Sequence, residues 1–429
     1  MISRDTWIKI IRDFEERPFP NDLKDRLIDI PLDVPLNRAI ALLGPRRAGK
    51  TYTMFLLIKR LIESGVEVDR IVHVNFESLD LAGVSLADVK NFLNIYFEIH
   101  PKNFGKDLWF FLDEVQGLVG WEVFVRDLID RGVRTYISGS SSKFLSREIA
   151  TQLRGRCIGY EIYPLCFKEF LSFKNIVGEK FPSTRNKSTI LNCLREYLKF
   201  GGYPEIVIFP EAREKILKEI IDVVIERDII ERYGVRNSRV LRLLIKALAS
   251  SKRFSVHKFY NFLKSSGIRV SKNTLYTYLE ALNDSFITFP VRRFSRSYKD
   301  EETSLPKVYF VDNGLLTVQG VDDEGKLMEN LVFVELLRRF GLEKIRYFLH
   351  NDKEVDFIIK DGNMVTQLVQ VSHSIEDFET REREVKPLIK ASELLDCNSM
   401  LILTWDTEEE IKVEGKAIKL LPLWKWLLT

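Results

Sequence analysis

One octapeptide, GPRRAGKT at residues 44–51, constrains the fold of this chain more than any other feature. It has the spacing G-x-x-x-x-G-K-T, follows the short apolar run 39–43, and precedes a stretch, 52–64, with apolar residues at helical spacing. A glycine-rich turn between a buried strand and a helix directs backbone N–H groups and the positive end of a helix dipole at an anion. The sequence therefore predicts a nucleotide phosphate site rather than a structural glycine turn.

The residues of this loop can be given roles. We expect Lys50 to reach the β- and γ-phosphates of ATP, and the Thr51 hydroxyl to hold Mg²⁺. The predicted nucleotide contacts are Gly44, Pro45, Arg46, Arg47, Ala48, Gly49, Lys50, Thr51 and Tyr52.

Strand and helix patterns alternate after the loop. Apolar runs at 71–76, 108–112 and 134–140 read as strands, and helical spacing separates them at 86–98 and 120–131. This alternation predicts an α/β domain with a parallel sheet covered by helices.

Two carboxylates, Asp113 and Glu114, end the second of these apolar runs. A parallel strand delivers its last residues to the sheet edge where ligands bind. We assign Asp113 to the metal ion and Glu114 to general base catalysis, against the alternative of a solvated loop. Further polar residues follow the strand 134–140: the Ser140 hydroxyl could contact the γ-phosphate. Arg154 and Arg156 could reach a nucleotide in a neighbouring subunit, with a plain surface role as the alternative.

Four segments carry a resemblance to a family: GPRRAGKT, LWFFLDEVQ, SGSSSKFLSREIATQLRGR and YEIYPLCFKEFL. The chain resembles a prokaryotic family of AAA+ type P-loop ATPases, whose C-terminal domain of unknown function looks restriction-endonuclease-like. The resemblance implies an ATPase core and a homo-oligomer. By position it suggests Lys50 and Thr51 as Walker A, Asp113 and Glu114 as Walker B, Ser140 as sensor, Arg156 as arginine finger, and Asn75 as a residue coupling ligand state to the catalytic glutamate.

Bulk properties limit the alternatives. A chain of 429 residues with 45% apolar and 30% charged residues is typical of a soluble protein of two to four domains. Because it lacks a secretory signal, a run of 18 uncharged apolar residues and any C-x-x-C pair, we expect a cytoplasmic location with no membrane segment. The five histidines include no H-E-x-x-H, so a zinc site is not expected.

The segment 236–299 concentrates positive charge. It holds fourteen basic residues against two acidic ones, a net charge of about +12 in a chain whose total is +3. Helical patterns at 240–248, 255–265 and 271–283, with strand candidates at 287–293 and 307–311, fit a winged helix-turn-helix. This pattern favours DNA as a partner, with Asn273, Thr274 and Tyr276 toward the groove. The alternative is a three-helix domain for subunit contacts.

The last segment carries the traces of a nuclease-like core. Glu329 on a predicted helix and Asp356 on a predicted strand are two of the acids that such a core uses. The next strand, however, has Gln370 and Ser372 where an active enzyme has E-x-K. We therefore expect an inactive domain, unless the missing lysine comes from elsewhere in the chain.

Together these observations predict five domains. They are an N-terminal helical arm (1–35), an AAA+ core (36–166), a helical lid (167–235) with a loop or hinge at 201–204, a winged helix (236–306) and a nuclease-like domain (307–429). The predicted function is Mg²⁺-dependent ATP hydrolysis coupled to action on DNA. The alternatives are a nucleotide-dependent switch that docks protein partners without binding DNA, and, less favoured, a metal-dependent nuclease.

Overall fold

The computed structural model describes residues 2–33, 38–140, 153, 155–179, 182–235 and 237–429. The chain divides into two compact units, one of residues 1–163 with 284–286, the other of residues 164–283 with 287–429. Each unit is described by itself. Within the described residues, no helix is both long and apolar enough to cross a membrane.

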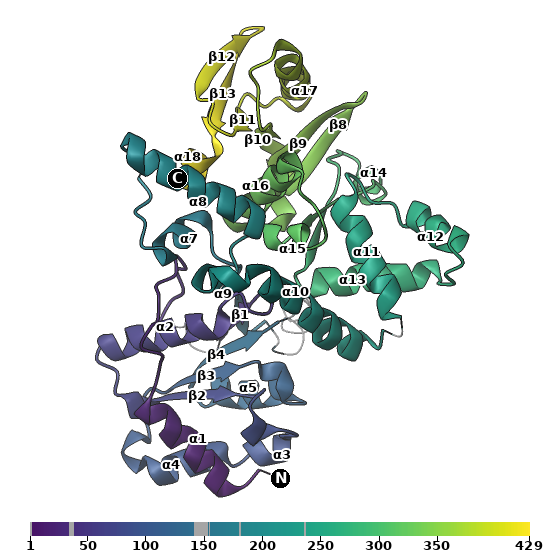
Figure 1. Cartoon of the computed structure of the whole chain (residues 1–429). Helices are drawn as coiled ribbons and strands as arrows, with labels where there is room; N and C mark the ends of the chain where they lie inside the picture. The colour runs from purple at the N-terminus through teal and green to yellow at the C-terminus, as the bar shows by residue number, and fades with distance from the viewer. Residues whose placement is uncertain (1, 34–37, 141–152, 154, 180–181, 236) are drawn as a thin grey trace. The chain divides into compact units, whose positions relative to one another are not determined.

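A five-stranded parallel sheet forms the centre of the first unit (Figure 1). Its strand order is β2-β3-β4-β1-β5, so β1 lies between β4 and β5. The strands are β1 (Ala39–Leu43), β2 (Ile71–Asn75), β3 (Trp109–Asp113), β4 (Arg134–Gly139) and β5 (Cys157–Glu161). Because β1 and β3 are buried along their whole length, their sequences are continuous apolar runs that do not alternate, apart from Asp113 at the end of β3. The predicted parallel α/β core is confirmed.

Helices of the first unit begin near the predicted positions. They are α1 (Arg4–Glu16), α2 (Lys50–Glu63), α3 (Leu86–Val89), α4 (Phe92–Ile99) and α5 (Trp121–Asp130). The single helix predicted over 86–98 is two short helices, because Asn91, at φ −96° and ψ 1°, leaves the helical conformation between them. Ser85 and Asp88 form a capping box at the start of α3.

The second unit begins with helices. They are α7 (Phe167–Phe173), α8 (Thr184–Phe200), α9 (Pro204–Ile208) and α10 (Arg213–Val223), and a π-helix (Val224–Glu231) continues α10. The turn before α9 is anchored, because the Gly202 N–H donates to the Asp312 carboxylate at 2.7 Å and the Gly202 carbonyl accepts from Leu165 N–H, also at 2.7 Å. These bonds favour a fixed loop over a hinge.

Three helices and a two-stranded antiparallel sheet follow, where the sequence predicts them. They are α11 (Ser238–Ser250), α12 (Val256–Ser265), α13 (Lys272–Asp284), β6 (Thr288–Val291) and β7 (Lys307–Phe310). Ser255 accepts a hydrogen bond at the N-cap of α12, and Gly267, with φ +75°, lies in the turn after that helix.

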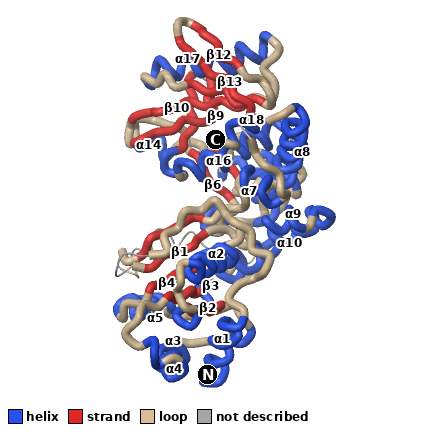
Figure 2. Tube along the Cα trace, turned by 90° about the vertical axis from the view of Figure 1, so that its left-hand side faces the viewer, coloured by secondary structure: helices blue, strands red, loops and turns tan. Residues whose placement is uncertain are grey.

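The C-terminal part is a six-stranded mixed sheet with order β12-β13-β11-β10-β9-β8 (Figures 1 and 2). Ile358 packs in one core cluster with Leu388 of α17, whereas the neighbouring Phe357 contacts Phe333 of α16. Since successive side chains of a strand point to opposite faces, α16 and α17 cover opposite faces of the sheet. The remaining elements are α14 (Tyr298–Glu302), α15 (Asn313–Thr317), α16 (Glu324–Phe340), β8 (Ile345–His350), β9 (Lys353–Asp361), β10 (Met364–Val371), α17 (Phe378–Leu395), β11 (Met400–Thr404), β12 (Glu409–Val413), β13 (Lys416–Pro422) and α18 (Leu423–Leu427).

The apolar C-terminal tail belongs to this core. Trp424 and Trp426 of α18 are buried, with 2% and 7% of their surfaces exposed.

Candidate active site

The loop between β1 and α2 needs glycine at both of its ends. Gly44 has φ +155°, and a Cβ there would lie 2.0 Å from the carbonyl oxygen of Ile162. Gly49 has φ +100° and forms the N-cap of α2. Side chains at these positions would strain or displace the backbone, which explains why the pattern has glycine at these two positions.

Lys50, the first residue of α2, is buried beneath this loop with 4% of its surface exposed. Its ammonium donates to the backbone carbonyls of Gly44 at 3.1 Å and Pro45 at 3.2 Å. It also lies 3.5 Å from the Glu114 carboxylate. A positive charge is thus held directly against the backbone that the sequence predicts to bind phosphate.

The next residue, Thr51, contacts the end of β3. Its hydroxyl donates to Asp113 Oδ2 at 2.6 Å, and the Ser138 hydroxyl of β4 donates to Asp113 Oδ1. Asp113 is fully buried. A hydroxyl beside a carboxylate is a ligand set that suits Mg²⁺, so these side chains fit the predicted metal role.

Glu114 leaves the strand in a left-handed conformation, with φ 47° and ψ 52°. Its backbone N–H donates to the Ser138 hydroxyl at 2.8 Å, and its carboxylate accepts from Gln116 at 2.5 Å. Burial alone would raise the pKa of Glu114, but the Lys50 charge and the Gln116 hydrogen bond outweigh burial and hold that pKa below its ordinary value. Glu114 is therefore ionised at neutral pH, as a general base must be.

Two residues of this site were not predicted from the sequence. Ser138 bridges Asp113 and the Glu114 backbone, whereas the residue predicted from the same serine-rich segment is Ser140, which is also fully buried. Arg26 is 6% exposed and donates to the carbonyls of Ala48 at 3.0 Å and Tyr163 at 2.9 Å. The polar end of a strand beside Asp113 could have indicated Ser138, but no local pattern marks Arg26.

The other predicted residues take varied places. Arg46 forms a two-pronged pair with Glu77, at 2.9 and 3.2 Å, and Tyr52 is half exposed at the start of α2. Asn75 is exposed, and its side-chain oxygen accepts a hydrogen bond from the Glu77 N–H at 2.9 Å.

Arg156 lies at the end of the sheet where β1 begins, opposite the end from which the loop extends. Its carbonyl accepts from Ala39 N–H at the first residue of β1, whereas the loop follows the last residue of that strand. Its guanidinium pairs with Asp130 at 2.5 Å and is 42% exposed. Arg156 therefore does not join its own chain's loop, Lys50 and Asp113. Arg154 lies outside the described residues.

The strand order, the phosphate loop and the paired carboxylates define a P-loop ATPase of the AAA+ class. Comparison with known proteins agrees, because residues 36–171 match the AAA domain and residues 192–324 match a domain of unknown function, DUF8612.

Two relatives resemble nearly the whole chain. An uncharacterized protein of Methanocaldococcus jannaschii is 37% identical over 94% of this chain and 90% of its own length. An uncharacterized protein of Haemophilus influenzae is 31% identical over 90% and 93%, respectively. Among solved structures, a Walker-type ATPase of Pyrococcus abyssi aligns with 14% identity over 75% of this chain and 96% of its own, with a TM-score of 0.42. The chain belongs to the family of archaeal and bacterial AAA-domain ATPases that includes the first two relatives.

Proposed function

We propose that this ATPase hydrolyses ATP in the presence of Mg²⁺ with the residues grouped around the loop between β1 and α2. Thr51 and Asp113 would hold the metal ion, which would supply positive charge to offset the negative charge of the phosphates. Glu114 accepts the proton of the water that attacks the γ-phosphorus, and Lys50 balances the charge of the phosphates. The observation that carries this proposal is the direct contact of Thr51 with Asp113 beside the Lys50–Glu114 pair.

Completion of the site by a second subunit belongs to the same proposal. Arg156 is far from its own loop along β1 but half-exposed, so it is placed to serve as a finger for a neighbouring copy in a homo-oligomer. Arg154 stays a second candidate, and Ser140 stays the proposed γ-phosphate sensor. In mixed oligomers of the inactive Arg156→Ala and Lys50→Ala chains, a Lys50→Ala chain should supply Arg156 to the intact site of an Arg156→Ala neighbour, so turnover should return only if the finger acts across the interface. Failure of such mixtures would remove the assignment.

We further propose that ATP hydrolysis is coupled to binding of DNA through α12 and α13. Exposed cations lie along these two helices, and Asn273 and Tyr276 at the start of α13 are exposed beside them. Some basic residues of 236–299 are already engaged in ion pairs: Lys252 and Arg253 pair with Glu354, and Arg242 pairs with Asp222. The exposed cations of the two helices and the turn between them are Lys258, Lys264, Arg269 and Lys272.

Salt dependence of DNA affinity tests this coupling. Duplex binding, measured by fluorescence anisotropy, should weaken steeply as salt rises, because neutralised phosphates release counterions. Lys264→Glu with Arg269→Glu should weaken binding and reduce the salt slope. The control is Lys344→Glu with Lys390→Glu, which changes the net charge by the same amount. These two lysines form ion pairs elsewhere in the second unit.

The alternative is a nucleotide-dependent switch in which the basic helices dock an acidic protein. ATP turnover that does not respond to single-stranded, duplex or branched DNA, together with equal DNA affinity for both double variants, would favour that alternative.

A further inference from the structure

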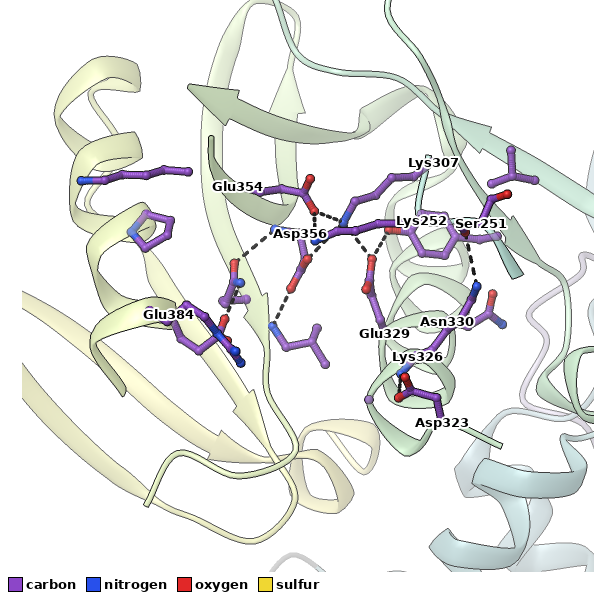
Figure 3. A pocket seen from close by; sticks show the side chains of 18 of the residues that line it. Ser251, Lys252, Lys307, Asp323, Lys326, Glu329, Asn330, Glu354, Asp356 and Glu384 are labelled. Carbon is purple, nitrogen blue, oxygen red and sulfur yellow. Dashed lines mark hydrogen bonds and ion pairs between the residues drawn. The ribbon is translucent and has the colours of Figure 1, made fainter. Parts of the chain in front are cut away.

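A cavity of about 810 Å³ opens in the second unit, between α16, α17, β7, β9 and β10. Three carboxylates meet at one of its walls (Figure 3). Glu329 comes from α16, and Glu354 and Asp356 come from the same face of β9. Glu329 and Asp356 are the two acids from which the sequence predicts a nuclease-like domain.

Lys307 of β7 enters this group and is almost fully buried, with 1% of its surface exposed. Its ammonium lies 2.8 Å from Glu329 Oε1, 2.8 Å from Glu354 Oε1 and 3.1 Å from Asp356 Oδ1 (Figure 3). One nitrogen therefore contacts all three acids. The missing lysine does come from elsewhere in the chain, but it lies among the carboxylates.

A nuclease of the expected type needs a divalent metal ion at these acids, and the residues present do not fit one. Mg²⁺ requires oxygen ligands at about 2.1 Å around a common centre, and here the ammonium occupies that centre. The Tyr309 hydroxyl donates to Glu329 Oε1 at 2.6 Å, and the Val371 N–H donates to Asp356 Oδ2 at 3.1 Å. Among the residues that the structure describes, no group of three or more His, Cys, Asp or Glu side chains is arranged to hold a metal ion.

The two residues that replace E-x-K are also engaged. Gln370 accepts from the Asp356 N–H at 3.2 Å and donates to Glu384 of α17 at 2.6 Å. Ser372 donates to the Ser374 carbonyl at 2.7 Å. Gln370 thus fixes β9 against α17 and offers no carboxylate.

The formal charges of the group balance without any added ion. Glu354 lies 3.2 Å from Lys252 and 3.8 Å from Arg253 in addition to Lys307. Its buried oxygens accept no hydrogen bond from the described residues, so these cations supply its compensation. Three cations face three carboxylates, and a divalent ion would have to displace an ammonium that each acid already contacts.

We propose that Lys307 is a built-in cation that occupies the metal position of this pocket, so that the second unit binds no Mg²⁺ or Mn²⁺ there and cleaves no phosphodiester by a metal-dependent route. Removing the ammonium would leave three buried carboxylates without their central partner. The same substitution should therefore create a divalent cation site that the natural chain lacks.

Mn²⁺ binding to the full-length chain tests this inference. Titration is done without nucleotide in an Asp113→Asn background, which removes the carboxylate expected to bind metal in the ATPase site. We expect no Mn²⁺ bound in this background, one ion per chain after Lys307→Met, and loss of that ion when Asp356→Asn is added. Lys344→Met, at an exposed lysine, is the matched control and should add no site.

Thermal unfolding supplies a second readout. Lys307→Met should unfold at a lower temperature than its parent and be restored by millimolar Mn²⁺, whereas Lys307→Arg should not respond to Mn²⁺. A folded Lys307→Met chain that gains no Mn²⁺ site overturns the proposal.

If Lys307→Met does not fold, Mn²⁺ binding and DNA cleavage by the natural chain still test the proposal. Mn²⁺ binding that Asp356→Asn abolishes, or Mg²⁺-dependent cleavage of DNA that the same change abolishes, would show that a metal ion does enter the pocket. No Mn²⁺ binding and no cleavage in the natural chain is the expected result.

Discussion

Each unit of this protein buries a lysine beside carboxylates, and the two lysines have different partners. Lys50 is held by two backbone carbonyls and lies 3.5 Å from one acid, Glu114. Lys307 contacts three acids at 2.8 to 3.1 Å. Two of the partners of Lys50 are neutral carbonyls, so a single carboxylate opposes its charge. Three carboxylates surround Lys307, so its charge is fully offset within the fold.

The carboxylates of the two sites also differ, because their pKa values are shifted in opposite directions. Lys50 and Gln116 overcome burial and hold the pKa of Glu114 below its ordinary value. At Asp356, burial dominates the opposing effect of Lys307, and the neighbouring Glu329 adds to it, so the pKa is raised to about 7. Glu114, the acid proposed to accept a proton during turnover, is kept ionised, while Asp356, in the group around Lys307, is partly protonated.

Removing the Lys50 charge should have the largest effect. Lys50→Ala should slow ATP turnover on the order of 10³-fold, because the phosphates lose a buried cation. Phosphate release at saturating ATP measures it. Lys59→Ala, at an exposed lysine of the same helix, is the control and should turn over normally. Turnover near normal in a folded Lys50→Ala protein would remove the contrast with Lys307.

Removing the Glu114 charge should have the next largest effect. Glu114→Gln should hydrolyse ATP about 10²- to 10³-fold more slowly but still bind it, because only proton transfer is lost. Single-turnover hydrolysis and binding of a fluorescent ATP analogue separate the two quantities, with Glu98→Gln at an exposed site as control. If nucleotide binding disappears together with hydrolysis, Glu114 is not a general base.

The pH dependence of the unfolding free energy tests the raised pKa of Asp356 and so its contrast with Glu114. Because the folded-state pKa of Asp356 lies above its unfolded value, its contribution is fully present below about pH 4 and is lost as the pH rises through about 7. The unfolding free energy of the natural chain, relative to Asp356→Asn, should therefore fall by roughly 1–3 kcal/mol between about pH 5 and about pH 8. Urea unfolding measures it.

Asp361→Asn, at an exposed end of the same strand, is the control for this measurement and should show no such trend. A difference that grows with pH would reverse the sign assigned to Asp356.

The smallest expected effect is at Ser138. Ser138→Ala should slow turnover about tenfold by leaving Asp113 Oδ1 and the Glu114 N–H without this partner. Turnover as a function of Mg²⁺ concentration should show a weaker Mg²⁺ response, whereas a loss of folding alone would lower turnover at every Mg²⁺ concentration. Ser140→Ala provides the comparison. A larger effect at Ser140 than at Ser138 would favour the sensor assignment made from the sequence.

Most strands and helices could be predicted from the sequence because local patterns of apolar and capping residues determine them. The strands that lead to Gly44 and Asp113 are apolar throughout, and the helices after Ser255 and Ser271 begin at polar caps, so periodicity and capping were sufficient. The prediction of one continuous helix over 86–98 was wrong, because helical spacing does not reveal the break at Asn91.

Long-range contacts explain what could not be predicted. Lys307 meets Glu329, Glu354 and Asp356 across separations of 22 to 49 residues, and nothing near it in sequence marks it as a core cation. The prediction that this domain lacks an acid and a lysine rests on the glutamine and serine in place of E-x-K. Only the arrangement of β7 beside β9 shows which lysine fills the group.

The hydrogen bonds of Arg26 to the Ala48 and Tyr163 carbonyls place the start of the ATPase core upstream of the AAA match. The AAA match starts at residue 36, yet Arg26 holds the carbonyl of Ala48 from 22 residues upstream. A fragment cut at the family boundary would contain every recognised motif and lack the guanidinium that fixes the loop. Expression of the ATPase core by itself should therefore start before residue 26, and a shorter fragment with an intact motif would understate the activity of the enzyme.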